Sequence, residues 1–320
     1  MAQKKAFYTY IIMGKIFKKI TFLTAIILFS VHNIQAQNDA KLSIFNYNPL
    51  LYNPAFAGSA DGLSIVGIYS SQWVGFDGAP KTQYLSADTK SLGNIGYGIS
   101  LYHDVIGPKK EYNIEGNFAY YIKLDRKYNL VLGVKSGINS YSINRNNLDV
   151  YQPGEDISNF DQESKTSPIF GIGANFYTNK FFIGLSSPNL IQDRYSNSSG
   201  SGLSQRRNYY YTNFGYQFEL ERDVTLTPAL LARITAGAPI SVLTSLNLNL
   251  RNKYLASVNF DYNSSVGLFA GIQIIDDLKI GYAYDIATTK FSNYNNGSHT
   301  FFLSYTLLNE NSEKCTCHLY

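Results

Sequence analysis

The residues that could carry out catalysis are few in this sequence. Of the four histidines, only His103, which is followed by Asp104, stands where a hydrolytic triad could be built. A triad also needs a serine nucleophile within hydrogen-bond reach of the imidazole, often on a Gly-x-Ser-x-Gly elbow between a strand and a helix. The sequence contains no such elbow. It therefore predicts no catalytic residue, and we interpret His103 as a polar residue at a strand end.

Possible ligands for metals and cofactors are equally sparse. The segment 143–166 is acidic, but its spacing does not match a calcium loop of the EF-hand type. Cys315, Cys317 and His318 are too few for a closed zinc or other soft-metal site. Four glycines stand at strand spacing, which predicts close packing inside a fold instead of a phosphate loop: Gly96, Gly98, Gly171 and Gly173. We expect no metal site and no cofactor.

The first 36 residues read as a targeting segment. Five lysines precede a short apolar run at 20–31, and Ile34-Gln35-Ala36 forms a cleavage box before Gln37, as in a Sec signal peptide. Without this segment, 22 of the 27 basic residues remain against 23 acidic ones, so the mature chain has a net charge of −1. This balance argues against a nucleic-acid-binding surface. We expect an exported protein with signal peptide 1–36.

The mature chain alternates apolar and polar residues, segment after segment. In 111–123 one face carries Tyr112, Ile114, Phe118 and Tyr120, while the intervening residues are mostly polar. Successive side chains of a strand point to opposite faces, so this pattern predicts one apolar and one polar surface. The pattern predicts fourteen strands, at 62–72, 80–89, 94–103, 111–123, 128–142, 167–178, 180–187, 207–220, 223–235, 239–251, 253–262, 264–275, 278–288 and 298–308.

Strand length and loop length indicate a transmembrane barrel. Strands of 9–12 residues suit a bilayer. Tight turns follow the even-numbered strands and longer connections, such as 73–79, 104–110, 143–166, 188–206 and 289–297, follow odd-numbered ones. Bacterial outer-membrane barrels have short periplasmic turns and long external loops. We therefore predict an all-β antiparallel barrel over 62–308, with both termini in the periplasm and a tail at 309–320.

A soluble β-sandwich would also alternate apolar and polar residues. Three features count against it: strands longer than the usual 5–6 residues, a charged fraction of only 16%, and aromatic residues near strand ends. The polar face is rich in Gly, Ser and Asn, which suits a lumen filled by water or by a loop.

The segment 37–61 precedes the barrel and does not alternate. It contains the apolar stretch KLSIFNYNPLLYNPAFAG at 41–58, in which Asn48-Pro49 and Asn53-Pro54 favour turns or helix starts. We expect it on the periplasmic side. It is either a plug that packs into the barrel mouth or a docking segment for another protein.

A family resemblance emerges from ordered blocks over about 50–308. The run from Leu51 to Gly58, LYNPAFAG, resembles the YNPAxAG signature of the PorP/SprF family, outer-membrane proteins of the type IX secretion system in Bacteroidetes. The blocks that follow are similar to the family's pattern in the same order: Gln72-Trp73 with Gly75–Thr82, then Asn94–Gly98, Gly133–Asn139 and Gly184–Asn189. Ser71 departs from the pattern, since a basic residue is expected before Gln-Trp.

The resemblance implies a non-enzymatic component of type IX secretion. Such proteins assist the secretion or surface retention of partner proteins, often gliding adhesins, and contact other secretion components, cargo and outer-membrane lipid. A passive porin for small solutes is the alternative, and a barrel enzyme acting on lipid is a second rival. We expect the signature to contact partners or to shape the fold through Tyr52, Asn53, Pro54, Phe56, Gly58, Gln72, Trp73, Gly78 and Pro80.

Overall fold

The computed structural model describes most of the chain between Ser43 and Leu308. The described residues are 43–60, 62–91, 93–144, 163–191, 194–196, 202–205, 208–236 and 238–308. The expected signal peptide, the acidic part of segment 143–166 up to residue 162, and the tail 309–320 lie outside them. All the strands belong to one compact unit, residues 38–236 and 240–320.

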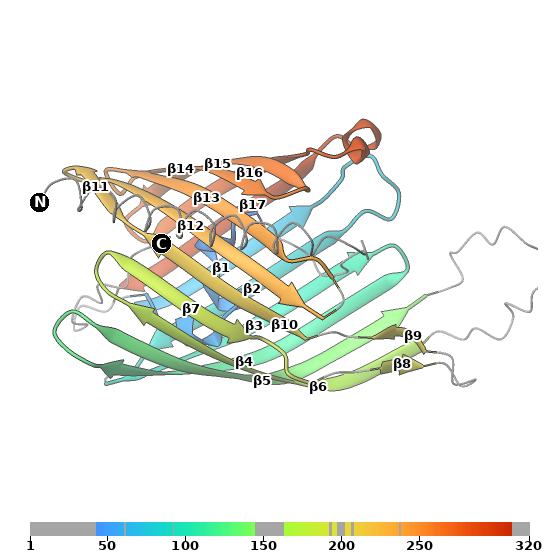
Figure 1. The fold of residues 1–320 in the computed structure, drawn as a ribbon, viewed down its shortest axis with the longest axis horizontal. Helices are drawn as coiled ribbons and strands as arrows, with labels where there is room; N and C mark the ends of the chain where they lie inside the picture. Colours follow the sequence, from blue (N-terminus) through green and yellow to red (C-terminus); the bar gives the residue numbers. More distant parts are fainter. Residues whose placement is uncertain are drawn as a thin grey trace, which may run out of the picture. The chain divides into compact units, whose positions relative to one another are not determined.

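Long antiparallel strands make up nearly all of this unit (Figure 1). The first seven are β1 (Gly62–Ser71), β2 (Lys81–Lys90), β3 (Ile95–Ile106), β4 (Lys109–Lys123), β5 (Asn129–Ile143), β6 (Glu163–Tyr177) and β7 (Phe181–Ser187). After a short hairpin of β8 (Arg194–Ser196) and β9 (Gly202–Gln205) come β10 (Tyr209–Tyr216), β11 (Phe218–Glu221), β12 (Val224–Thr235), β13 (Ser241–Leu250), β14 (Tyr254–Asp261), β15 (Ser265–Ile275), β16 (Leu278–Ala287) and β17 (Ser298–Leu308).

The sheet closes on itself. Neighbours in sequence pair with one another, β1 pairs with β17, and β10 pairs with both β7 and β12. Strands β10 and β11 are a single strand interrupted at Gln217, since both pair with β12. The fifteen strands of the sheet are therefore fourteen barrel strands, which confirms the predicted all-β antiparallel barrel and excludes the sandwich.

The alternation assigns the two faces as predicted. Ile99 is 53% exposed on the outside of the barrel, while its neighbour Ser100 is 1% exposed inside. In β4, Tyr112, Ile114 and Phe118 are outward and Asn113, Glu115 and Asn117 are buried. An apolar outer face over a polar inner face is the transmembrane barrel pattern, so the strand periodicity in the sequence fixed the face of each side chain.

The connections correct one prediction. Strands β3 and β4 run on to Ile106 and Lys109, so the connection expected at 104–110 shrinks to the two-residue turn Gly107-Pro108. Gly107 has φ +54°, a left-handed conformation that suits a tight hairpin. The alternation continues through this stretch, so the strands could extend beyond the membrane-length window.

Among the described residues, no helix is long and apolar enough to span a membrane.

Candidate functional site

The segment before β1 lies inside the barrel and forms its plug, which we define as residues 43–60 (Figure 1). It folds into three short 3₁₀ turns, η1 (Phe45–Tyr47), η2 (Pro49–Leu51) and η3 (Pro54–Phe56). Proline stands first in η2 and η3, where its fixed φ suits a helix start and its missing N–H costs nothing. Both Asn-Pro pairs therefore start helical turns, as the sequence predicted. The structure places the segment deeper than the expected periplasmic position.

Apolar side chains of the plug pack against the barrel wall on all sides. Ile44 packs with side chains of β1, β2 and β14–β17, and Phe45 and Tyr52 pack with β10, β12 and β13. On the remaining side, Leu50, Ala55, Phe56 and Ala57 pack with Ala119, Tyr121, Val131, Tyr177 and Phe182 of β4–β7. Burial raises the pKa of Tyr47, so its hydroxyl stays protonated. The wall is apolar at these inward positions because it meets the plug instead of water.

Glycines on the wall make room for the backbone of the plug. A Cβ atom added at Gly96 would lie less than 3.0 Å from the carbonyl oxygen of Ala57. One added at Gly133 would collide with the backbone of Pro54 and Ala55, and one at Gly173 with the side chain of Asn53. We call these three glycines, on β3, β5 and β6, the glycine slot. The sequence predicted such packing for Gly96 and Gly173, and Gly133 lies in the Gly133–Asn139 block.

Hydrogen bonds fix the same stretch of plug to the wall. The side chain of Asn53 accepts a bond from the N–H of Ala55 at 2.9 Å and donates one to the carbonyl of Ala174 at 3.1 Å. The hydroxyls of Tyr121 and Ser186 donate to the carbonyls of Ala57 and Tyr52, both at 2.9 Å. These bonds satisfy backbone groups that burial in the lumen would otherwise leave unpaired.

The end of the plug is held in a single conformation. Gly58 has φ +72°, and its N–H donates to a carboxylate oxygen of Asp88 at 2.8 Å. A side chain at this position would meet the backbone of β2 and β3. Gly58 therefore meets both demands of the chain's entry into β1, a left-handed φ and close approach.

One buried ion pair lies between the plug and the wall. Lys135 of β5, 1% exposed, contacts Glu115 of β4 at 2.6 Å and donates a longer bond of 3.4 Å to the carbonyl of Leu51. A buried charge is tolerated only when it is paired, because desolvation is costly. Lys135 thus couples a wall carboxylate to the plug backbone.

Beyond the plug, the barrel's own polar side chains fill the bore. Thr82 donates to Asp104 at 2.7 Å, and Ser100 accepts bonds from Tyr84 and Asn117, both at 3.0 Å. Their exposed fractions are all 3% or less. Nearby, Ser70 and Thr300 bond to each other across β1 and β17. Since these inward side chains are shielded from water, the bore is closed at this level.

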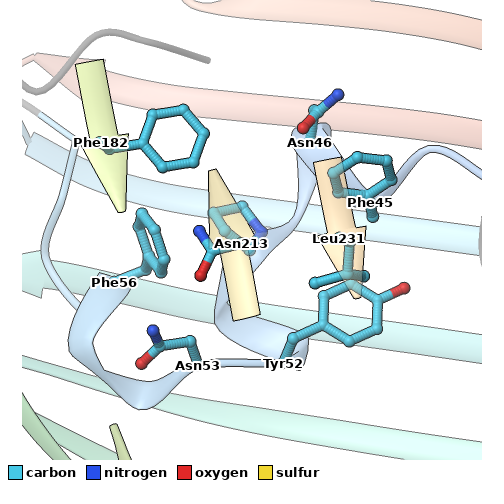
Figure 2. Close-up of a pocket in the computed structure, with 9 residues that line it drawn as sticks. Phe45, Asn46, Tyr52, Asn53, Phe56, Phe182, Asn213 and Leu231 are labelled. Atoms are coloured by element: carbon cyan, nitrogen blue, oxygen red, sulfur yellow. The ribbon is translucent and has the colours of Figure 1, made fainter. Parts of the chain in front are cut away.

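A small cavity remains between plug and wall (Figure 2). It measures about 10 Å³, the lower limit for holding one water molecule. Figure 2 shows Phe56 facing Phe182, with Asn53 below them and Asn213 beside them. The Phe56 and Phe182 rings meet edge to face, with centroids 6.4 Å apart. The cavity is far too small for a solute.

The second signature block lies at the opposite end of β1, in a rim loop that we define as residues 72–80. Its ends are joined by a hydrogen bond from the N–H of Gln72 to the carbonyl of Pro80 at 2.9 Å. Gly78, with φ +73°, accepts a bond from the N–H of Gly107 in the next hairpin. The expected roles of Gln72, Gly78 and Pro80 are therefore met structurally, by closing the loop and joining it to the next hairpin.

Aromatic side chains gather on this rim. Trp73 is 36% exposed and Phe76 is 46% exposed, and both pack edge-on against Phe291 of η6 (Lys290–Tyr294), at 4.9 and 5.3 Å between centroids. Two backbone bonds of 2.8 Å tie Val74 to residues 296 and 297, so the two loops form one platform. Trp73 has φ +48°, which is rare for a bulky residue and characteristic of functional or strained sites.

The structure brings the sequence-predicted residues into two separate places. Tyr52, Asn53, Pro54, Phe56 and Gly58 lie in the lumen, where Tyr52 is 8% and Phe56 4% exposed. The other predicted residues, Gln72, Trp73, Gly78 and Pro80, lie on the rim at the long-loop end. A shared contact surface for Tyr52, Phe56 and Trp73 at one mouth of the barrel is therefore not formed.

The only triad candidate falls apart in the structure. His103 points outward and stacks on Tyr112 at 4.1 Å between ring centroids, while Asp104 points into the lumen and binds Thr82. Adjacent residues of a strand face opposite sides of the sheet. His103 and Asp104 therefore do not form a catalytic pair.

Sequence reasoning missed the wall side of the site. It did not single out the Glu115–Lys135 pair, Ser186 or Asp88, which hold the plug. A signal was present for Lys135, because it is a lysine at an inward position in the middle of a strand. The partners themselves could not be found, since each lies on a different strand from the group it binds.

Three solved outer-membrane barrels illustrate the similarity of the fold. The chain matches the CymD monoaromatic hydrocarbon channel at 10% identity, with 82% of this chain and 93% of that one covered and a TM-score of 0.49. It matches a TodX monoaromatic hydrocarbon channel mutant at 9% identity, with coverage of 81% and 94% and a TM-score of 0.49. The Omp33 outer-membrane protein of Acinetobacter baumannii gives 9% identity, coverage of 78% and 100%, and a TM-score of 0.45. These similarities carry no argument about function.

The comparison with curated proteins found no match. The comparison with family models matched residues 34–305, from before the plug to the last strand. This span contains the plug, the glycine slot, the buried ion pair and the rim loop. The chain is an outer-membrane β-barrel, and it belongs to the family described as type IX secretion system membrane protein PorP/SprF.

Proposed function

We propose that the protein is a non-enzymatic component of type IX secretion that recognises partner proteins and assists their secretion or their retention at the cell surface, as for gliding adhesins. The observation that carries this proposal is the filled lumen of a barrel whose family serves protein secretion. A closed bore cannot pass a polypeptide. The protein therefore acts through its surfaces.

The rim platform is the surface that fits a protein partner best. Its half-exposed aromatic side chains, Trp73 and Phe76, are held by a hydrogen-bonded loop and by Phe291. Large aromatic side chains on a preordered support commonly dominate protein interfaces. We assign the partner contact to this platform, with secreted cargo or another secretion component as the partner.

The plug residues contribute to function by closing the bore. Tyr52 and Phe56 already contact the barrel wall, so a direct contact with a partner would require the plug to leave the lumen. Their expected partner contact stays a prediction under that condition. Their role in the described conformation is to hold the barrel shut.

The porin alternative needs a continuous water-filled path. Inward side chains such as Ser100, Asn139 and Lys135 are no more than 1% exposed, which argues against such a path. A porin would also line its bore with solvated polar groups, whereas here the wall facing the plug is apolar. The filled lumen therefore favours recognition over passive transport.

A deletion strain tests the proposal. We expect it to lose one or a few large proteins from the cell surface, measured by quantitative surface proteomics, while uptake of small solutes stays nearly unchanged. Complementation with a Trp73→Ala, Phe76→Ala double variant should fail to restore these proteins although the barrel assembles. Gln83→Ala, Tyr210→Ala, changed on exposed strand positions away from the platform, serves as the matched control.

The result that would overturn the proposal is a deletion strain with a complete surface proteome and impaired uptake of a small solute. That outcome would support the porin. Lipid hydrolysis by the purified protein, abolished in a His103→Ala variant, would instead support an enzyme.

A further inference from the structure

The outward face of β1–β4, β16 and β17 carries an ordered arrangement that neither the plug nor the rim platform uses. The strand register places one row of mostly aromatic residues across these strands: Tyr282, Phe301, Tyr69, Gln83, His103 and Tyr112. All four of its Tyr and Phe side chains are 39–54% exposed. Rows of aromatic residues on a barrel mark the boundary between acyl chains and water. This row marks the boundary at the long-loop end.

The next row toward the loops carries two cations. Lys81 pairs with Val105, and Val105 pairs with Lys110, so the two lysines stand on alternate strands with Cα atoms about 10 Å apart. Both are exposed on the outer face. They lie two residues beyond the aromatic row, which is about 7 Å along a strand. This places both ammonium groups at the level of lipid headgroups.

No carboxylate neutralises these two lysines. The nearest acidic residues in the register, Asp104 and Glu111, point into the lumen, where Asp104 binds Thr82 and Glu111 pairs with Lys109. Over the described strands, the other outward positions of the long-loop half carry no Lys, Arg, Asp or Glu. The positive charge is therefore confined to one arc of an otherwise uncharged belt.

Ser71 and His299 continue the row on the side away from Lys110. Ser71 pairs with both Lys81 and His299, and His299 is hydrogen-bonded to the hydroxyl of Tyr282. These polar groups extend the headgroup level without adding a fixed negative charge. Below them lie apolar residues such as Leu85 and Leu101, exposed to the acyl chains. The arc thus offers cations above and an apolar surface beneath.

We propose that Lys81 and Lys110 form a binding site for the phosphoryl group of an outer-leaflet lipid. Lysine binds phosphate as a point charge, and two flexible side chains from alternate strands can converge on one phosphoryl group. Basic residues at headgroup level bind anionic lipids in the same way. Aromatic and aliphatic side chains below the lysines accommodate the acyl chains, which selects a lipid over a soluble anion. The inference needs only the orientation with the long loops outside, and it is independent of the secretion role.

Lipid titration of the purified full-length protein tests the site. The protein in detergent micelles is titrated with bis-phosphorylated lipid A and, in a second arm, with the same lipid after removal of both phosphates, and bound lipid is counted by native mass spectrometry. A Lys81→Gln, Lys110→Gln variant should bind the phosphorylated lipid about tenfold more weakly. Binding of the dephosphorylated lipid should not change.

Two further variants make the comparison decisive. Lys127→Gln, Lys180→Gln removes the same charge from exposed turns at the opposite end of the barrel and should bind like the parent protein. Lys81→Arg, Lys110→Arg keeps the charge and should retain binding. Heat-modifiable migration in gel electrophoresis establishes that each variant is a folded barrel.

Three results would overturn the inference. The first is equal binding of phosphorylated lipid A by the Gln variant and the parent. The second is an equal loss for the phosphorylated and dephosphorylated lipids, which would indicate a change in the acyl-chain surface. The third is competition by millimolar inorganic phosphate, which would identify the ligand as a free anion.

Discussion

The plug and the rim loop flank the same strand and have similar compositions, yet they have opposite environments. Each contains aromatic residues, a proline and left-handed glycines: Phe56, Pro54 and Gly58 in the plug, and Phe76, Pro80 and Gly78 in the rim loop. Phe56 is 4% exposed and Phe76 is 46% exposed. Composition therefore does not decide between a buried and a docking role. What decides is whether the wall opposite offers a complementary surface.

The difference lies in the partners available to each segment. The plug faces glycines, inward apolar residues and hydroxyl donors that the barrel wall supplies. The rim loop faces Phe291 and two backbone bonds on one side and solvent on the other. A segment with contacts on all sides stabilises its own chain, and one with a free face can contact another molecule.

Truncating the matched phenylalanines gives the largest expected effect. Phe56→Ala should lower the free energy of unfolding by about 3–5 kcal/mol, because it removes a buried ring that packs on Phe182. Phe76→Ala should cost less than about 1 kcal/mol, since its ring is half exposed. Denaturant titration of both variants in lipid vesicles makes the measurement. Equal costs would show that the plug is not packed as described.

Filling the glycine slot should have the next largest effect. Gly133→Ala places a methyl group against the backbone of Pro54 and Ala55, which cannot move aside as a side chain can. We expect a cost of about 1–3 kcal/mol and a detectable conductance in planar bilayers as the plug is displaced. Gly67→Ala is the control, because nothing lies within 4 Å of its added Cβ. An unchanged, non-conducting Gly133→Ala barrel would contradict the close approach of plug and wall.

Removing the amide of Asn53 should produce a smaller loss. Its side chain caps η3 and reaches the carbonyl of Ala174, so Asn53→Ala should cost about 0.5–2 kcal/mol. Asn295 makes similar local bonds to Gly297 and Phe291 at the rim, and Asn295→Ala provides the comparison. If the rim variant loses more stability than the plug variant in the same titration, the plug contributes less to the fold than the rim does.

Trp73→Ala should have the smallest effect on stability and a clear effect on function. Its ring contacts Phe291 and is otherwise exposed, so the expected cost is below about 1 kcal/mol. Binding of a surface partner should nevertheless weaken, measured by co-purification from outer membranes. A Trp73→Phe variant, which keeps an aromatic ring, should restore part of it. Full co-purification with Trp73→Ala would remove the rim platform from the proposed interface.

The packed lumen also changes the expected tolerance of its wall. Ile99 faces lipid, and Ile99→Arg would place a charge in the acyl-chain region. From the sequence alone, Ser100→Arg would look harmless, because it faces a polar lumen. Ser100 is 1% exposed and accepts bonds from Tyr84 and Asn117, so an arginine has no room there. Alternation predicted the direction of the side chain, and only the structure showed that the lumen is full.

The sequence by itself determined the barrel, because the period of two along each strand fixes which residues face lipid, as in Tyr112, Ile114 and Phe118 against Asn113, Glu115 and Asn117. The Asn-Pro pairs likewise determined where η2 and η3 begin, since proline sets its own φ. Only the tertiary structure decided that the plug lies in the lumen, that Lys135 pairs with Glu115, and that Lys81 and Lys110 share one row. The physical reason is that these contacts join different strands and loops, whose neighbours are set by the register and closure of the whole sheet.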